Sequence, residues 1–238
     1  FFFNFSLALI LNANAVEDEN KIAVLVGDYL LSKGLMLTTE NNRLDLLHIV
    51  SNAVKEMAEG ELLQMEKARK LDIDEKIYYK IIKQKTASLV AACCGTGACS
   101  VVGDKPMVDT MLRVGTNVGM AFQIKDDIFD FGSSENIGKP TGIDIRERKM
   151  TLPLIYTLNK VDSKTKRKII NTFKRYNEDN DRVNEVIDLV IQNGGIKYAE
   201  TKMHEYKEKA LSDLKEIPDS PSKKAFIGLI EYSINRKK

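Results

Sequence analysis

The sequence predicts an all-helical bundle, and three observations support this prediction. Apolar residues recur at three- and four-residue spacing along most of the 238-residue chain, which is the period of a helix with one buried face. Breakers are scarce, with 5 prolines and 14 glycines, and a turn-rich β fold needs more of them. Strand-like alternation of apolar and polar residues is nearly absent. Helices of this kind bury their apolar faces against one another, so a single bundle is expected.

The first helices follow from apolar spacing and from capping residues. Residues 22–37 and 44–68 each place apolar side chains on neighbouring turns with no proline between them. Asp72 and Asp74 offer N-cap chemistry before the helix expected over residues 77–102.

Capping residues, glycines and prolines separate the later helices. The helix expected over residues 104–131 begins with Asp104 as its cap and Pro106 in its first turn, where proline is tolerated. A polar loop containing three glycines follows over residues 132–149. Glycine and proline pairs then divide the rest of the chain into helices over residues 152–158, 164–176, 181–192, 196–214 and 222–234.

The composition excludes several classes of function. Lys and Arg number 36 and Asp and Glu 34, which gives a net charge of +2. Nucleic-acid binders carry a clear basic excess, so no nucleic-acid partner is expected. Cys93, Cys94 and Cys99 form no CxxC pair. They predict neither a disulfide framework nor a cysteine zinc site, and they suit a reducing cytoplasm.

The first residues differ from the rest of the chain. Residues 1–15 are apolar and end in a small-polar-small pattern, as the end of a secretory signal does. We favour the alternative of one buried helix or a mis-started coding region. The stretch is too short to cross a bilayer, and charged residues interrupt the other apolar runs, so no stable membrane span is expected. We therefore divide the chain into an atypical apolar segment over residues 1–19 and a single helical domain over residues 20–238.

The sharpest feature is a group of three aspartates, Asp126, Asp127 and Asp130, in the stretch FQIKDDIFD. Asp126 and Asp130 are four residues apart and share one helix face, with Asp127 beside them. Because the surrounding residues are apolar, the carboxylates need a counter-charge or protons. Carboxylate oxygens suit Mg²⁺, which binds through one or two carboxylates plus substrate phosphates. A solvated helix end is the alternative.

The loop after the aspartates adds residues that suit a phosphate. Its glycines let the backbone approach an anion closely, and Lys139 supplies a point charge. Lys149 adds a second cation, and Asp144 can reach a metal-bound water. The loop is not a Walker P-loop, because the GxxxxGK[ST] order is missing. With Lys85 and Thr86 upstream, a weak signal alone, these residues favour metal-bridged handling of a diphosphate over covalent catalysis.

At this point the chain resembles a known family, the trans-type isoprenyl diphosphate synthases (polyprenyl synthetases). The resemblance begins near Asn20 and runs to the C-terminus in the family's order. It rests on several motifs that agree in sequence and spacing: FQIKDDIFD, the family's second aspartate-rich motif with Gln123 in the glutamine position; GKPTGIDIRERKMTLP after it; KTA at Lys85–Ala87; VLVGDYLLSKGL with Gly27 and Asp28; EGELLQM with Gly60, Glu61 and Gln64; and GGIKYAE.

One departure from the family pattern changes the expectation. The family's first aspartate-rich motif should lie shortly before VLVGDYLL, but that region reads FFFNFSLALILNANAVEDEN, and its three acidic residues do not form the motif. The resemblance therefore implies an isoprenoid-synthase-like helical bundle lacking the N-terminal helices, truncated at its N-terminus, with doubtful activity by itself.

The resemblance also implies the reaction and the roles of the residues. The enzyme condenses isopentenyl diphosphate with an allylic diphosphate to make a polyprenyl diphosphate, with Mg²⁺ as cofactor, in the cytoplasm. The residues carried over are Asp126, Asp127 and Asp130 as Mg²⁺ ligands with Asp144 behind them, Lys85, Lys139 and Lys149 on the allylic diphosphate, and Thr86 and Gln123 near the reacting end of the substrate.

Two other functions stay open at this stage. Family members that lack one aspartate motif can act as non-catalytic regulatory subunits of hetero-oligomeric prenyl diphosphate synthases, so a homodimer and a hetero-oligomer are both expected assemblies. A terpene cyclase-like lyase is less favoured, because those proteins do not usually combine the KTA and GKxxGxD segments. The sequence does not predict the length of the product chain.

Overall fold

The structure is a computed structural model that describes residues 17–70, 73–101, 104–132 and 141–236. Within those ranges every regular element is a helix, which confirms the predicted fold class. The helices are α2 (Glu17–Glu40), α3 (Leu44–Lys70), α4 (Glu75–Ile82), the π-helical turn η2 (Lys83–Ala87), α5 (Ser88–Val101), α6 (Lys105–Phe129), α8 (Ile143–Arg146), α9 (Leu152–Lys160), α10 (Ser163–Arg175), α11 (Asn180–Gln192), α12 (Gly195–Asp213), the 3₁₀ turn η3 (Leu214–Glu216) and α13 (Pro221–Asn235).

The chain falls into two compact units, residues 1–51 and 52–238. The first contains α2 and the first turns of α3, and the second contains the remaining helices. The boundary between these units lies inside α3. The single domain expected over residues 20–238 stays a prediction.

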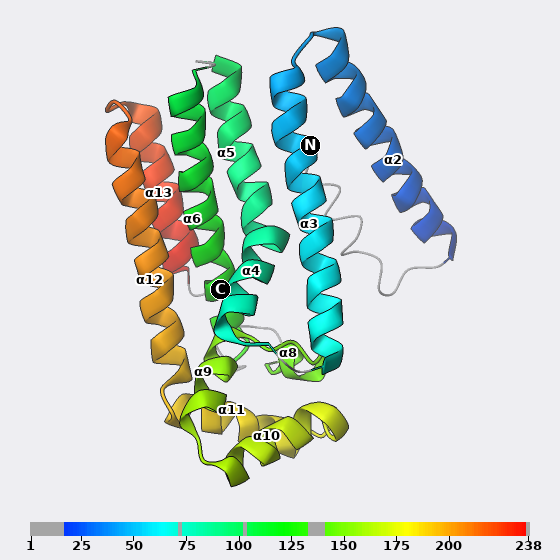
Figure 1. Ribbon diagram of the computed structural model, residues 1–238, viewed down its shortest axis with the longest axis vertical. Coiled ribbons are helices and arrows are strands. Elements are labelled where there is room, and N and C mark those ends of the chain that lie inside the picture. The colour runs from blue at the N-terminus through cyan, green and yellow to red at the C-terminus, as the bar shows by residue number, and fades with distance from the viewer. Residues whose placement is uncertain (1–16, 71–72, 102–103, 133–140, 237–238) are drawn as a thin grey trace. The chain divides into compact units, whose positions relative to one another are not determined.

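The second unit is built around α6. Figure 1 shows α6 between α5 on one side and α12 and α13 on the other, with α10 and α11 crossing at one end. Side chains of α6 such as Val114, Ala121 and Ile124 are fully buried. The short helix α9 adds Leu152 and Leu154, which are also fully buried. The last turns of α6, which carry the aspartates, are therefore held from several sides.

Two glycines let α6 approach its neighbours closely. A Cβ atom on Gly115 would lie 2.6 Å from the Cα of Ala91 in α5, and one on Gly119 would lie 2.5 Å from the Cα of Ala87 in η2. Carbon atoms in contact are normally about 3.5–4.0 Å apart. The missing side chains at these two positions therefore set the distance between α6 and the KTA segment.

Capping residues start two of the helices, as the sequence predicts. Asp74 accepts a hydrogen bond from the Ile77 N–H at 2.7 Å, at the start of α4. Asp104 accepts one from the Met107 N–H at 2.7 Å, at the start of α6.

The Asp104 cap gives a first testable prediction. Asp104→Ala should lower the free energy of unfolding by about 1 kcal/mol, because the first turn of α6 loses its acceptor. Urea unfolding measures this value. Asp109→Ala is the control, because Asp109 is exposed on the same helix and the loss should there be smaller. Equal losses in both variants would contradict the capping role.

The structure differs from the predicted elements in two places. The helix expected over residues 77–102 begins at Glu75 and contains the π-helical turn η2, whose hydrogen bonds reach five residues along the chain rather than four. The expected loop over residues 132–149 contains the short helix α8. Helical periodicity is too coarse to reveal either feature.

The expectation that no stretch beyond residue 15 could span a membrane is wrong by length and composition. Residues Lys21–Glu40 form a helix with a mean hydropathy of 1.3, long and apolar enough to cross a bilayer, and 6% of the residues in that window are buried. Asp28 and Lys33 interrupt this apolar run, but two charges do not lower its mean hydropathy enough to exclude a membrane span by composition. Core helices and signal sequences pass the same test, so the finding does not by itself place this helix in a membrane.

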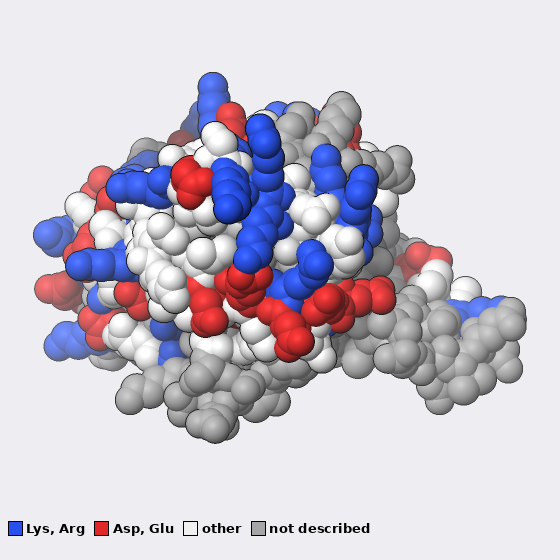
Figure 2. Space-filling view, turned by 90° about the horizontal axis from the view of Figure 1, so that it is seen from below, with Lys and Arg blue, Asp and Glu red and all other residues white. Residues whose placement is uncertain are grey.

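The end of the second unit formed by α10 and α11 carries charges of both signs. Figure 2 views the molecule from this end and shows Lys and Arg side chains interspersed with Asp and Glu. Lys168 pairs with Glu185 between the two helices, and Arg182 pairs with Asp179 at 3.5 Å. The lysines of α10 therefore belong to a solvated surface of mixed charge.

Candidate active site

The last turns of α6 turn Asp127 inward, away from solvent. Its side chain is 5% exposed. One carboxylate oxygen accepts a hydrogen bond from the Tyr78 hydroxyl at 2.7 Å, and the other accepts one from the Gln123 amide at 2.9 Å. Asp127 therefore points into the protein, with both of its carboxylate oxygens already engaged.

Gln123 connects Asp127 to the KTA segment. The Thr86 hydroxyl donates to the Gln123 side-chain oxygen at 2.7 Å, while the Gln123 nitrogen donates to Asp127. Because the amide accepts at one end and donates at the other, its orientation is set. The structure thus joins Thr86 and Gln123, which lie 37 residues apart.

The turn η2 presents Lys85 to the C-terminal half of α3. The Lys85 ammonium donates to the Gln64 side-chain oxygen at 2.7 Å and pairs with Glu61 at 2.6 Å. Gly60 permits this contact, because a Cβ there would lie 2.8 Å from the Lys85 backbone nitrogen. Lys85 is about one third exposed. Its charge is therefore accessible and already partly compensated.

Asp130 fastens the loop that follows α6. Its carboxylate accepts hydrogen bonds from the backbone N–H groups of Ile143 at 2.8 Å and Asp144 at 3.1 Å, and its carbonyl accepts one from Gly142 at 2.9 Å. Gly142 has φ of +75°, a left-handed conformation that favours glycine. This contact brings Asp144 next to the end of α6.

Asp144 and Lys149 form a second group beside Asp130. The Lys149 ammonium lies 3.9 Å from an Asp144 carboxylate oxygen and also pairs with Glu147. The Lys149 N–H donates to the Asp144 carbonyl at 2.7 Å. The segment between them is therefore folded into a tight turn that keeps the lysine near the carboxylates.

Asp126 has a counter-charge from the far end of the chain. The Arg236 guanidinium pairs with Asp126, and its central carbon lies 4.3 Å from the ring centre of Phe122 and 5.4 Å from that of Phe129. Arg236 is not among the site residues that the sequence predicts, because 110 residues separate it from Asp126.

Burial raises the pKa of three carboxyls at this site, so each becomes harder to ionise. Burial raises the pKa of the Asp127 carboxyl to about 7, and its two hydrogen-bond donors offset only part of this effect. Burial, followed by the charges of Asp127 and Asp130, raises the pKa of Asp144 to about 8 against the opposing effect of Lys149. The pKa of Asp130 is raised as well, mainly by burial. A bound cation would favour the charged form of each carboxyl.

The donor chemistry fits a hard divalent cation. Among the described residues, no three His, Cys, Asp or Glu side chains converge on one point as a complete metal cage. Mg²⁺ does not require such a cage, because it binds through one or two carboxylates and takes its other ligands from water and substrate phosphates. Asp126 and Asp130, one helical turn apart, can supply those carboxylates.

The structure brings most of the predicted residues together, in three groups. These are Thr86, Gln123 and Asp127 in one line of hydrogen bonds, Asp130, Asp144 and Lys149 around the loop, and Lys85 with Glu61 and Gln64. Lys139 lies outside the described residues.

Two contacts at the site were absent from the prediction, that of Tyr78 with Asp127 and that of Arg236 with Asp126. Tyr78 lies seven residues before Lys85, a spacing that keeps it on one helix face, but tyrosine is common in apolar helices and gives no signal by itself.

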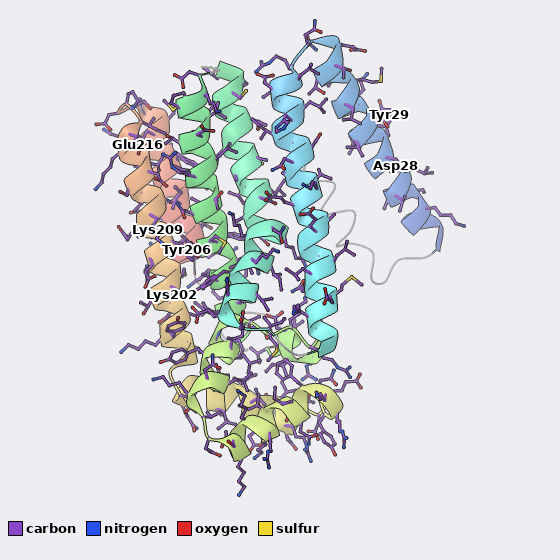
Figure 3. The ribbon with its side chains drawn as sticks, viewed as in Figure 1. Asp28, Tyr29, Lys202, Tyr206, Lys209 and Glu216 are labelled. Carbon is purple, nitrogen blue, oxygen red and sulfur yellow. The ribbon has the colours of Figure 1, made fainter. Side chains whose placement is uncertain are left out.

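Other motif residues and charged side chains lie elsewhere. Figure 3 shows Asp28 and Tyr29 on α2, in the first unit, where both are exposed. It also shows Lys202, Tyr206 and Lys209 along α12. The Lys209 ammonium lies 4.8 Å from the centre of the Tyr206 ring, a contact that stabilises the surface of α12.

Comparisons with known proteins point to one family. A family model described as polyprenyl synthetase matches residues 12–190. The chain is 31% identical over 222 residues to octaprenyl diphosphate synthase of Escherichia coli (strain K12), covering 91% of this chain and 67% of that protein. It is 30% identical over 220 residues to heptaprenyl diphosphate synthase component 2 of Bacillus subtilis (strain 168), covering 92% and 62%.

A solved structure agrees with these relatives. The crystal structure of polyprenyl synthase from Caulobacter crescentus CB15, complexed with calcium and isoprenyl diphosphate, aligns with a TM-score of 0.83 at 30% identity. The alignment covers 92% of this chain and 67% of that one.

Proposed function

The chain belongs to the polyprenyl synthetase family of prenyl-group transferases, and from this premise we propose that its site binds an allylic diphosphate through Mg²⁺ and condenses it with isopentenyl diphosphate. The single observation that supports this best is the pair of carboxylates, Asp126 and Asp130, one turn apart at the end of α6, with the charge of Lys149 acting on Asp130. The chain spans 67% and 62% of the length of the two curated relatives, so its own activity is part of the proposal.

The proposed metal site uses two carboxylates at the end of α6. Asp126 and Asp130 would hold Mg²⁺, and Asp144 would orient its water ligands from behind. When bound, Mg²⁺ would neutralise the negative charge that builds on the leaving diphosphate. The Caulobacter crescentus structure is described as complexed with calcium and isoprenyl diphosphate, which supports a divalent cation in the proposed function.

The chain's own residues would act on the two ends of the allylic substrate. In the proposed reaction the bond between the allylic carbon and its oxygen breaks, and the electron pair leaves with the diphosphate. The double bond of isopentenyl diphosphate then attacks the allylic cation, and a proton is lost. Lys85 and Lys149 would hold the departing diphosphate by charge, together with Lys139.

Thr86 would face the other end of the breaking bond. Its hydroxyl proton is directed at Gln123, so the lone pairs of its oxygen point elsewhere. Oxygen lone pairs stabilise a neighbouring positive charge, which suits an allylic cation.

The test is a transfer assay on the full chain. Purified protein is incubated with Mg²⁺, an allylic diphosphate and labelled isopentenyl diphosphate, and the extended prenyl product is quantified. Magnesium-dependent incorporation is expected and should disappear with a chelator. A folded sample that neither turns over nor binds the allylic diphosphate with Mg²⁺ would refute the proposal.

A non-catalytic subunit is a second candidate function. It is favoured by the relative named heptaprenyl diphosphate synthase component 2, a name that implies a further component of that enzyme. In this case the chain would co-purify with a complete synthase, and Asp126→Ala would leave the activity of the complex unchanged. For either function we propose a cytoplasmic protein in a homodimer or hetero-oligomer.

The contact between Arg236 and Asp126 predicts competition with the metal. Arg236→Ala should tighten Mg²⁺ binding by about two- to fivefold, since a solvent-accessible ion pair contributes up to about 1 kcal/mol. Calorimetric titration with Mg²⁺ measures the change. Arg182→Ala is a matched control, because Arg182 also pairs with an aspartate and lies over an aromatic ring, 3.7 Å from the centre of Tyr176. Weaker Mg²⁺ binding in Arg236→Ala would contradict the competition.

A further inference from the structure

The Tyr78 hydroxyl is buried next to the site without facing the substrate. Tyr78 lies in α4 and is 3% exposed, and its ring makes an edge-on contact with Tyr79 at 5.5 Å between centres. Its hydroxyl donates to Asp127 at 2.7 Å. This hydrogen bond joins two helices whose residues lie 49 positions apart in the sequence.

The hydrogen bond is the first of three in a line. Tyr78 donates to Asp127, Gln123 donates to the other oxygen of Asp127, and Thr86 donates to Gln123. Because both Asp127 oxygens accept, Gln123 turns its nitrogen toward Asp127 and its oxygen toward Thr86. The direction of the Thr86 hydroxyl therefore depends on where the Asp127 carboxylate is held.

Hydrogen bonds from Tyr78 and Gln123, rather than from water, fix the position of the Asp127 side chain. With both oxygens engaged and 5% exposure, it can keep its conformation only while its two donors stay in place. Removing the Tyr78 hydroxyl would leave one buried oxygen without its donor and allow the side chain to rotate. The Gln123 amide could then flip and present its nitrogen to Thr86.

We infer that Tyr78 is a positioning residue that holds Asp127, and through it Gln123 and Thr86, in the orientation that the reaction needs. The inference rests on the proposed function, which places Thr86 and Gln123 beside the reacting carbon. It makes Asp127 an orienting group for Gln123 and leaves the metal to Asp126 and Asp130.

The first experiment reads the orientation of Gln123 directly. The chain has four glutamines, so protein labelled with ¹⁵N-glutamine gives few side-chain amide signals, and Gln123→Ala assigns the one in question. Tyr78→Phe should shift this signal and speed its hydrogen exchange. Tyr198→Phe is the matched control, because Tyr198 donates to Glu75 at the same 2.7 Å, and it should leave the Gln123 signal in place.

The second experiment reads the reaction. Tyr78→Phe should lower kcat by about 10- to 100-fold, as loss of an orienting partner does, while KM for the allylic diphosphate changes by less than about twofold. Tyr198→Phe should change neither value. The double variant Tyr78→Phe with Gln123→Ala should be no slower than Gln123→Ala alone, because both act on one group.

The outcomes separate this inference from the proposed function. If the unsubstituted chain shows no transfer, the function proposal fails and the Gln123 signal still decides the positioning role. An unchanged Gln123 signal and an unchanged kcat in folded Tyr78→Phe would overturn the inference. If Tyr78→Phe does not fold, the Tyr78 hydroxyl proton is observed in tyrosine-labelled protein: slow exchange supports the buried hydrogen bond, and rapid exchange overturns it.

Discussion

Asp130→Ala is expected to lower magnesium-dependent prenyl transfer by about 100- to 1,000-fold, the loss typical of removing one group that stabilises charge in a transition state. The Asp130 carboxylate has two roles, and the substitution removes both. It would be a metal ligand, and it accepts the backbone N–H groups of Ile143 and Asp144. Without it, the loop that carries Asp144 and Lys149 loses its attachment to the end of α6.

The measurement combines turnover with binding of the allylic diphosphate in the presence of Mg²⁺. Asp162→Ala is the matched control, because the Asp162 carboxylate also accepts two backbone N–H groups, at 2.7 and 3.1 Å, but at the start of α10. It should weaken that cap and leave Mg²⁺ dependence unchanged. A similar fall in turnover for both aspartate variants would show that Asp130 acts through stability alone.

Gly119→Ala is expected to lower the free energy of unfolding by about 1–3 kcal/mol, the usual cost of overpacking a tight contact. The new methyl carbon would lie 2.5 Å from the Cα and 2.9 Å from the Cβ of Ala87. Backbone atoms cannot move aside as a flexible side chain can, so η2 must shift away from α6. That shift would lengthen the hydrogen bond from Thr86 to Gln123 and slow transfer as well.

Denaturant unfolding and the transfer assay measure the two effects. Gly97→Ala is the control, because a Cβ at that position in α5 meets nothing within 4 Å. There the substitution should stabilise the protein by about 0.5–1 kcal/mol, since alanine favours a helix over glycine. The prediction for Gly119 would be wrong if both alanine variants were equally stable.

Local patterns in the sequence predicted the helices well. Apolar spacing located the long helices, and Asp74 and Asp104 marked two of their starts, because a cap acts on N–H groups only two or three residues away. The proximity of Asp130, Asp144 and Lys149 also followed from their nearness in the sequence. These features depend on neighbours along the chain, which the sequence displays directly.

Features that depend on distant residues could not be predicted in this way. Asp127 is hydrogen-bonded to Tyr78, which is 49 residues away, and Asp126 pairs with Arg236, which is 110 residues away. The π-helical turn at η2 lies against α6 at Gly119 and has no periodic signal of its own. In the sequence, nothing distinguishes Asp127 from Asp126 and Asp130. In the structure, Asp127 is the buried member of the three.

The Lys85 ammonium already contacts Glu61 and Gln64, so a diphosphate bound there under the proposed function would have to compete with both. An ordinary anion such as sulfate would have to displace these groups for little gain in return. A diphosphate that arrives chelated to a cation can do so more easily, because the cation also satisfies the carboxylates across the site. Under the proposed function, these resident partners would keep abundant cellular anions from occupying the site between turnovers.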